Sequence, residues 1–267
     1  MRHSRPIVCA AVALATASTV LATPAVAAPA GENYVALGDS YASGVGTREY
    51  FGDSGDCLRS PKAYPQLWAD SHHVADFAFA ACSGAVTDDV NTQQLGRLNA
   101  GTTLVTVSIG GNDIGFADVV TKCLLGTDAG CDSAVGGGEE KARKELPGKL
   151  DATYANIRRA APNAKVVVIG YPRLNELGAC SVPGYSERKR KRLNAGADLL
   201  AGVISERANA AGFTYADTRD AFAGHGVCSS NEWINGPSNP LVESFHPDID
   251  GHAQAYLPTL NGIINRP

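Results

Sequence analysis

The stretch Tyr34-Val35-Ala36-Leu37-Gly38-Asp39-Ser40-Tyr41 decides the fold of this chain. Its apolar part predicts a short buried β-strand, and the glycine that follows permits a sharp turn of the backbone. Ser40 therefore stands at the carboxyl end of a strand, where α/β proteins bind their ligands. Gly-Asp-Ser alone is equally typical of a turn that leads into a helix N-cap, so other residues must support a chemical role.

Strand-like runs alternate with helical stretches along the rest of the chain. The predicted strands are 34–37, 76–80 (the weakest), 104–109, 165–169 and 213–216. The predicted helices are 62–71, 90–98, 139–161, 186–211 and 251–264. This alternation favours right-handed crossovers and a parallel sheet that is covered on both faces. We therefore expect a single-domain, three-layer α/β/α fold, in which the glycine-rich segment 135–138 is a loop.

Residues 1–30 have the pattern of a secretory signal peptide. Basic residues at positions 2 and 5 precede an apolar region, 7–21, and small residues allow cleavage after Ala27 or Ala30. The apolar region is short for a membrane span. We therefore expect a secreted, extracellular protein whose folded domain is 31–267.

Cysteine usage fits export. Of the seven cysteines, Cys9 lies in the predicted signal peptide, which leaves six in the mature chain. An even number in an exported protein predicts three disulfides, although the sequence alone does not decide among the pairings. We expect neighbours to pair, because each bridge would tie down a loop near the proposed site. A zinc site is disfavoured, since the chain has no Cys-x-x-Cys. The expected bridges are Cys57–Cys82, Cys123–Cys131 and Cys180–Cys228.

Charge excludes one large class of partner. The formal net charge is −4, so the chain offers no basic surface for nucleic acid. The run Arg188-Lys189-Arg190-Lys191-Arg192 is local, and we expect it to be a solvated helix face. Contact of this run with anionic phospholipid head groups is the alternative.

Two residues have the properties of a nucleophile and its base. A serine hydroxyl attacks an ester only when a base accepts its proton. Ser40 follows a buried strand through a glycine turn, and His246 precedes Pro247, which favours an extended or turn conformation. His252 is expected to be structural. The elbow Gly-x-Ser-x-Gly of the α/β-hydrolases is absent from the sequence, which disfavours that fold.

Candidate oxyanion donors follow two other strands. Asn112 comes after a double glycine in Ile109-Gly110-Gly111-Asn112-Asp113, and Gly84 follows the weak strand. A side-chain amide and an unobstructed backbone N–H can both donate to a developing oxyanion. Each of the two residues is also typical of an ordinary turn.

These blocks together resemble the SGNH hydrolases, also called the GDSL lipase/esterase family. Gly38-Asp39-Ser40, Gly84, Gly110-Gly111-Asn112-Asp113 and His246 appear in the family's order and span most of the mature chain. The surroundings are similar to those of secreted Streptomyces lipases and phospholipases. The resemblance implies a flavodoxin-like sheet, no metal or other cofactor, and hydrolysis of carboxylic esters. It also implies an oxyanion hole formed by Ser40, Gly84 and Asn112.

The sequence departs from the family at one position. The family usually has aspartate three residues before the histidine, and this chain has Glu243. The resemblance to the Streptomyces enzymes implies instead a Ser–His dyad in which a backbone carbonyl, here that of Ser244, orients the ring of His246. Either acceptor would fix the tautomer that presents Nε2 to Ser40. We favour the Ser244 carbonyl and keep Glu243 as the alternative.

The sequence thus predicts a secreted esterase that acts on lipid esters such as triacylglycerols or phospholipids. The alternatives are a polysaccharide acetylesterase and a non-catalytic secreted binding protein. We expect a monomer that makes transient contact with lipid surfaces. Loops such as 115–149 are expected to shape the substrate groove.

Overall fold

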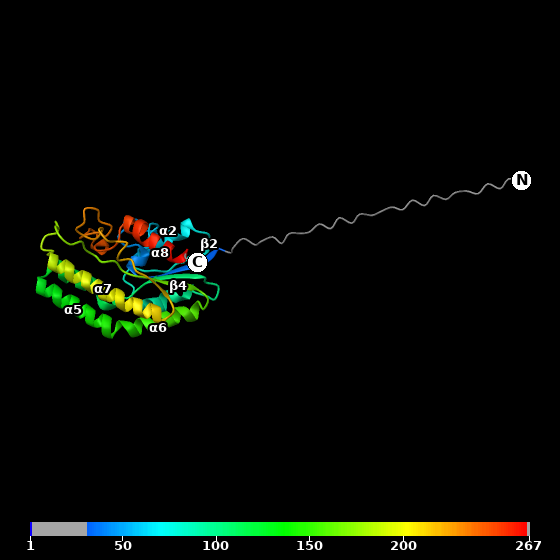
Figure 1. Cartoon of the computed structure of the whole chain (residues 1–267), viewed down its shortest axis with the longest axis horizontal. Coiled ribbons are helices and arrows are strands. Elements are labelled where there is room, and N and C mark those ends of the chain that lie inside the picture. The colour runs from blue at the N-terminus through cyan, green and yellow to red at the C-terminus, as the bar shows by residue number, and fades with distance from the viewer. Residues whose placement is uncertain (2–30, 266–267) are drawn as a thin grey trace. The chain divides into compact units, whose positions relative to one another are not determined.

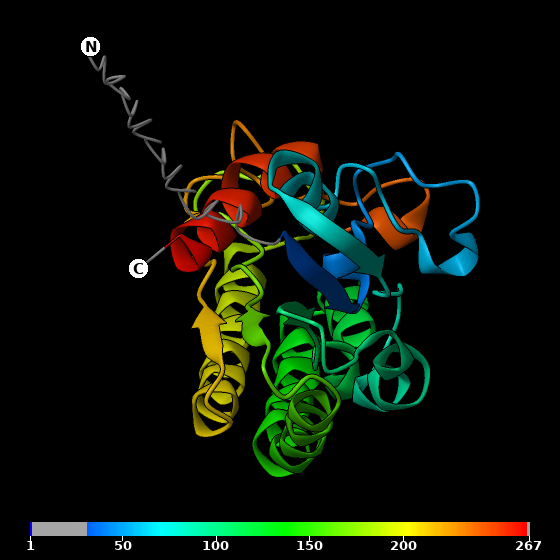
Figure 2. The same ribbon diagram turned by 90° about the vertical axis from the view of Figure 1, so that its right-hand side faces the viewer.

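Five parallel strands form a sheet in the computed structural model, which describes Met1 and residues 31–265 (Figures 1 and 2). The strands lie in the order β2-β1-β3-β4-β5, and every neighbouring pair is parallel. Their bounds are β1 Glu32–Gly38, β2 Val74–Phe79, β3 Leu104–Ser108, β4 Lys165–Ile169 and β5 Thr214–Ala216. The sheet contains all five predicted strands.

Helices cover both faces of this sheet. Figure 1 shows α2 and α8 on one face and α5, α6 and α7 on the other. The helices are α1 Ser40–Ser43, α2 Tyr64–Ser71, α3 Thr87–Asp89, α4 Phe116–Leu125, α5 Asp128–Lys144, α6 Leu146–Ala160, α7 Glu187–Ala210 and α8 Leu257–Ile264. Single helical turns extend α3 to Arg97 and precede α8 from Gly251. The predicted three-layer α/β/α fold is confirmed.

The strand order positions the site. The order 2-1-3-4-5 is that of the flavodoxin-like folds, in which the order of the parallel strands reverses between β1 and β3. Connections leave these two strands toward opposite faces, so a crevice opens at their carboxyl ends. Ser40 directly follows β1, and Asn112 follows β3. The topology therefore brings together two of the sequence-predicted site residues.

Two helix predictions are wrong. Segment 135–138 is not a loop but lies within α5, and the predicted helix 139–161 is divided between α5 and α6. One of these glycines, Gly138, lies at a helix contact, because a Cβ there would lie 3.4 Å from Val119 of α4. Gly196 of α7 likewise approaches Val135 of α5. Pro147 near the start of α6 lacks the N–H that a continuous helix would need, which accounts for the break. The predicted groove loops 115–149 are consequently mostly helical.

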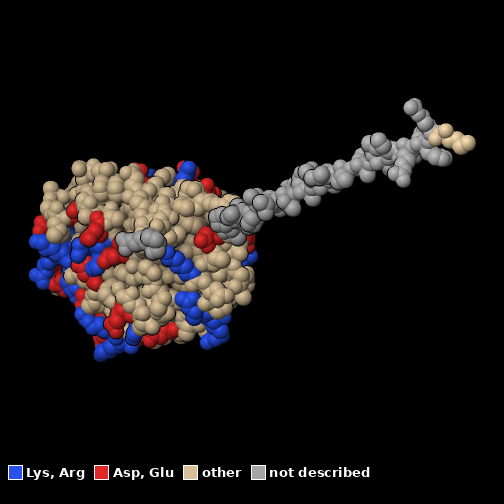
Figure 3. All heavy atoms as spheres, turned by 45° about the vertical axis from the view of Figure 1, so that its right-hand side comes forward, with Lys and Arg blue, Asp and Glu red and all other residues tan. Residues whose placement is uncertain are grey.

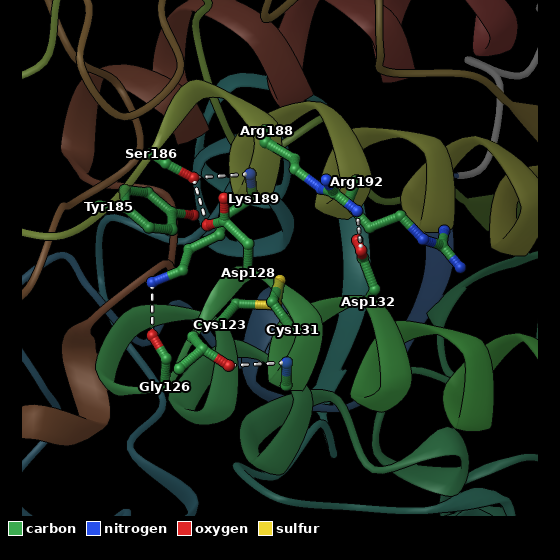
Figure 4. The surroundings of a disulfide bond; sticks show 12 residues. Cys123, Gly126, Asp128, Cys131, Asp132, Tyr185, Ser186, Arg188, Lys189 and Arg192 are labelled. Carbon is green, nitrogen blue, oxygen red and sulfur yellow. Dashed lines mark hydrogen bonds and ion pairs between the residues drawn. A yellow bond between two sulfur atoms is a disulfide. The ribbon is translucent and has the colours of Figure 1, made fainter.

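The basic run was also predicted wrongly in part. Lys189 and Arg190 are buried, and their cationic groups donate to backbone carbonyls rather than facing water. Figure 4 shows Lys189 of α7 reaching the carbonyl of Gly126 beside the Cys123–Cys131 disulfide. The first turns of α7 therefore hold the α4–α5 connection in place. Only the other three basic residues of the run face outward, and each pairs with a carboxylate.

Three cysteine pairs lie at disulfide-bonding distance. They are Cys57–Cys82, Cys123–Cys131 and Cys180–Cys228, which are the expected neighbours. On the face of the molecule that Figure 3 shows, basic and acidic side chains are intermixed. Residues 2–30 of the predicted signal peptide, which comprises residues 1–30, lie outside the described residues, as do the last two residues of the predicted domain. Within the described part, no helix is both long and apolar enough to cross a membrane.

Candidate active site

A glycine at the end of β1 creates the turn that presents Ser40. Gly38 has a φ of 132°, and a Cβ there would lie 2.4 Å from the carbonyl oxygen of Ser108 on β3. Only glycine fits this close approach. Asp39 then caps α1, since its Oδ1 accepts a hydrogen bond of 3.0 Å from the backbone N–H of Tyr41. The turn and the cap together place Ser40 at the first position of α1.

Ser40 and His246 are in direct contact, although 206 residues separate them. His246 Nε2 lies 2.7 Å from Ser40 Oγ, and His246 Nδ1 lies 3.0 Å from the carbonyl oxygen of Ser244. Burial lowers the pKa of His246 to about 4, against a smaller opposing effect of the Ser244 carbonyl. The imidazole is therefore neutral at pH 7. A neutral ring whose Nδ1–H donates to Ser244 leaves Nε2 free to accept the serine proton.

The histidine loop is fixed from two sides. Tyr41, the residue after Ser40, donates its hydroxyl to the carbonyl of Phe245 at 2.6 Å. Asn235 holds the next peptide, because both its backbone N–H and its side-chain amide donate to the carbonyl of His246. Asn235 is a positioning residue that the sequence analysis missed, and no local pattern marks it.

Glu243 points away from the imidazole. Its carboxylate is buried and accepts a hydrogen bond of 2.7 Å from the hydroxyl of Tyr50. Its other oxygen lies 3.4 Å from Nε of Arg48. Among the described residues, no hydrogen bond joins this carboxylate to the His246 ring. The geometry thus places Ser244, rather than Glu243, as the partner of Nδ1.

Of the two predicted oxyanion donors, Asn112 lies at the same cavity as the nucleophile, and Gly84 is connected to it through Ala85. Asn112 and Ser40 line the same cavity, and the Asn112 amide donates to the carbonyl of Ala85 at 3.0 Å. This bond ties the loop after β3 to Gly84 and its neighbours. Gly84 has a φ of 79°, a conformation that favours glycine, and no atom lies within 4 Å of where its Cβ would be.

A buried network joins the serine turn to the asparagine loop. Tyr171, after β4, donates its hydroxyl to Asp39 at 2.5 Å and accepts the backbone N–H of Gly111 at 3.1 Å. Burial raises the pKa of Asp39 to about 7, although the bond from Tyr171 opposes this shift. Gln94 adds a second clamp, since its amide group bonds both the N–H and the carbonyl of Gly38. The positioning roles of Tyr171 and Gln94 have no sequence signal, because their partners are distant in the chain.

An apolar cavity extends from Ser40 between α4, α5 and α7. Its polar end holds Ser40, Asp39 and Asn112. Aliphatic and aromatic side chains form most of the remaining wall, and small residues on α5 and α7 leave the space open. The lining from these three helices is Phe116, Val119, Val135, Gly138, Glu139, Ala142, Leu193, Gly196, Ala197 and Leu200. A cavity of this character suits the hydrocarbon chain of an ester held at Ser40.

His252 lies apart from this chemistry. It is fully buried, and its Nδ1 accepts the backbone N–H of Tyr64 at 3.2 Å. Burial lowers the pKa of His252 to about 3. The ring therefore has the structural surroundings that we expected. Within the described residues, no cluster of three or more His, Cys, Asp or Glu side chains is arranged to hold a metal ion.

Residues 36–254 match the model of the GDSL-like Lipase/Acylhydrolase family. The chain belongs to this family. The match includes Ser40, Gly84, Asn112 and His246, so the resemblance seen in the sequence is confirmed at the level of the family.

Three relatives of this GDSL-family protein are similar over most of their length. Lipase 1 of Streptomyces coelicolor is 48% identical over 257 residues, which cover 96% of this chain and 94% of the relative. The crystal structure of an extracellular lipase from Streptomyces rimosus is 46% identical, with a TM-score of 0.85. That of a phospholipase A1 from Streptomyces albidoflavus is 48% identical, also with a TM-score of 0.85. Each of these two alignments covers 87% of this chain and 99% of the other.

Proposed function

We propose that this protein is a secreted serine esterase that hydrolyses carboxylic esters of lipids. One observation carries the proposal: Ser40 Oγ contacts Nε2 of a neutral His246, and the other ring nitrogen is hydrogen-bonded to the Ser244 carbonyl. The apolar cavity that begins at Ser40 supports a lipid acyl group as the part of the substrate that is recognised. The lipase and phospholipase relatives support the same substrate class.

The reaction has two steps. Ser40 Oγ attacks the ester carbonyl carbon while His246 Nε2 accepts the hydroxyl proton. The oxyanion receives hydrogen bonds from the backbone N–H groups of Ser40 and Gly84 and from the Asn112 amide. His246 then gives its proton to the departing alkoxide, which leaves an acyl-enzyme. His246 Nε2 then takes a proton from a water molecule as the water oxygen attacks the acyl carbon. The bond to Ser40 Oγ breaks, and His246 returns the proton to this oxygen, which releases the acid and restores Ser40.

Exposed apolar side chains beside the histidine loop are our candidate for contact with lipid surfaces. Leu241 and Val242 directly precede Glu243 and are 71% and 46% exposed. Phe51, 37% exposed, follows Tyr50, whose hydroxyl is bonded to Glu243. Aliphatic and aromatic side chains in this position can enter the boundary of a lipid aggregate while Ser40 faces it. We propose that the protein makes this contact as a monomer, which size-exclusion chromatography with light scattering tests.

Hydrolysis assays test the function directly. The protein recovered from the medium of an exporting host should release fatty acid from tributyrin or phosphatidylcholine and p-nitrophenol from p-nitrophenyl butyrate. Ser40→Ala and His246→Ala should each lower kcat by about a thousandfold or more, because the two groups act as one unit. Near-normal turnover by a folded Ser40→Ala protein would overturn the proposal. Preferential release of acetate from acetylxylan would favour the acetylesterase instead.

Mass spectrometry of the protein from the medium tests the export. Cleavage of the predicted signal peptide should give an N-terminus at residue 28 or 31.

A further inference from the structure

A second, polar cleft begins beside the proposed oxyanion site. Gly84 and Ala85 line it, together with the Cys57–Cys82 disulfide and the helical turns after α3. The cleft shares no lining residue with the apolar cavity. The two are nevertheless adjacent, because Asn112 of the apolar cavity donates to the carbonyl of Ala85. An ester held at Ser40 therefore has an apolar space on one side and a polar space close by.

Two arginines of this cleft differ from the others in the described part of the chain. Arg59 and Arg97 both line the cleft. Among residues 31–265, neither side chain lies within ion-pair distance of a carboxylate or donates a hydrogen bond. Every other arginine between residues 31 and 265 has a carboxylate, amide or carbonyl acceptor. These partnered arginines are Arg48, Arg143, Arg158, Arg159, Arg173, Arg188, Arg190, Arg192, Arg207 and Arg219.

The acidic side chain of the cleft is already engaged. Asp89 accepts hydrogen bonds of 2.9 Å from the backbone N–H of Val86 and from the amide of Gln93. The side chains that line the cleft therefore include two cations without partners and one carboxylate that is bonded locally. Guanidinium groups bind phosphate oxygens in a planar, two-pronged geometry, so an anionic phosphate matches the unused donors.

We propose that Arg59 and Arg97 bind the phosphodiester of a glycerophospholipid whose ester is held at Ser40. The inference rests on the proposed esterase function and names a substrate class for it. In such a lipid, a short glycerol unit joins the scissile ester to the phosphate. Gly84 leaves room for this connection, since no atom lies within 4 Å of where its side chain would begin. A triacylglycerol has no anionic group for the two arginines to bind.

A comparison of two soluble substrates tests the proposal. Dihexanoylphosphatidylcholine, below its micelle concentration, and dihexanoylglycerol have the same acyl chains and differ in the phosphocholine group, whose phosphate is its only anionic part. The ratio of their kcat/KM values should fall by about tenfold or more in Arg59→Gln/Arg97→Gln, because charge-assisted bonds to the phosphate are lost. Arg159→Gln is the matched control. It removes an exposed charge near the end of α6, and the ratio should stay as in the unmodified protein. An unchanged ratio in the double variant overturns the proposal, as does an equal loss on both substrates.

Binding measurements separate the source of the phosphate from the esterase function. Glycerophosphocholine should inhibit p-nitrophenyl butyrate hydrolysis competitively, and the double variant should weaken this inhibition. Inhibition by inorganic phosphate alone would indicate a general anion site and contradict the headgroup assignment. Calorimetric titration of Ser40→Ala with dihexanoylphosphatidylcholine does not require turnover. Binding that depends on both arginines would support the cleft even if ester hydrolysis were absent, whereas arginine-independent or undetectable binding would count against it.

Discussion

His246 Nδ1 lies 3.0 Å from the carbonyl oxygen of Ser244, two residues earlier in the same loop. The orienting acceptor of the imidazole is thus a backbone group. Such an acceptor holds the ring and its tautomer but adds no negative charge to stabilise an imidazolium. The nearby carboxylate of Glu243 is directed to Tyr50 and Arg48 instead.

The first prediction concerns Glu243. Glu243→Gln should keep kcat on p-nitrophenyl butyrate within about tenfold, because no hydrogen bond to the imidazole is lost. Removal of an orienting carboxylate in a Ser-His-Asp triad costs about four orders of magnitude. Stability should fall, since the variant disturbs a buried contact with Tyr50, and thermal unfolding measures that separately. A loss beyond about a thousandfold in both Glu243→Gln and Glu243→Ala, with the fold kept, would identify a triad.

The second prediction is a pH profile. The pKa of His246 is lowered to about 4, so the base is neutral and active at any pH above that value. On a soluble ester, kcat/KM should stay level from pH 8 to about pH 5 and decline below about pH 4. The free energy of unfolding should change with pH in the same direction, and should decrease as the pH falls. The unfolded state takes up the proton near pH 6.5, so the contribution of neutral His246 is lost as the pH falls from 6.5 to about 4. Asp39, whose pKa is about 7, caps the same turn, so the profile is repeated with Asp39→Asn. An acid limb at pH 6.5 that remains in this variant, in protein that circular dichroism shows to be folded, would contradict the burial argument.

The third prediction concerns Asn112. Asn112→Ala should lower kcat by about a hundredfold or more and change KM little, because the bond to the oxyanion strengthens as charge develops. The variant also loses the hydrogen bond from the Asn112 side-chain amide to the Ala85 carbonyl, so its thermal stability should be measured beside its kinetics. Asn91→Ala, which removes the hydrogen bond from the Asn91 side-chain amide to the hydroxyl of Thr153, serves as the control. A rise in KM alone would make Asn112 a substrate-binding residue.

The fourth prediction concerns the apolar cavity. Ala142→Leu should fill space between α5 and α7 and shorten the acyl chain that fits. The ratio of kcat/KM on p-nitrophenyl dodecanoate to that on the acetate should fall by about tenfold, because added methylenes crowd a closely packed site. Ala210→Leu, at the exposed end of α7, makes the same change away from the cavity and should leave the ratio as it is. An unchanged ratio in Ala142→Leu would show that the acyl chain lies elsewhere.

The fifth prediction concerns lipid surfaces. Leu241→Ser/Val242→Ser should slow hydrolysis of a tributyrin emulsion by about fivefold or more, because apolar area that enters the lipid boundary is lost. Hydrolysis of dissolved p-nitrophenyl butyrate reports whether the catalytic groups are intact. Leu125→Ser alters a leucine that is 79% exposed at the end of α4, the opposite end of that helix from Phe116, which lines the apolar cavity. Equal slowing of the emulsion rate by Leu125→Ser would show that the effect is not specific to the histidine loop.

The sequence by itself determined the strands, their alternation with helices and the positions of Ser40 and His246. These features depend on local signals. A buried parallel strand needs a short apolar run, and the turn after β1 needs a glycine at residue 38, so both are visible within a few residues. The family pattern adds the order of the motifs along the chain. This order is visible in the sequence because each motif depends on particular residue types. The same local logic paired the neighbouring cysteines, which the structure places at bonding distance.

Only the tertiary structure decided what depends on partners distant in the chain. The glycine-rich segment 135–138 lies within α5, where Val135 and Gly138 contact α7 and α4. Lys189 is buried because Gly126 and Gly184 offer their carbonyls. The direction of Glu243 depends on Tyr50, which is 193 residues away. Local propensity carries no information about such contacts. They come from the packing of the folded chain, where most buried polar groups are hydrogen-bonded to a partner.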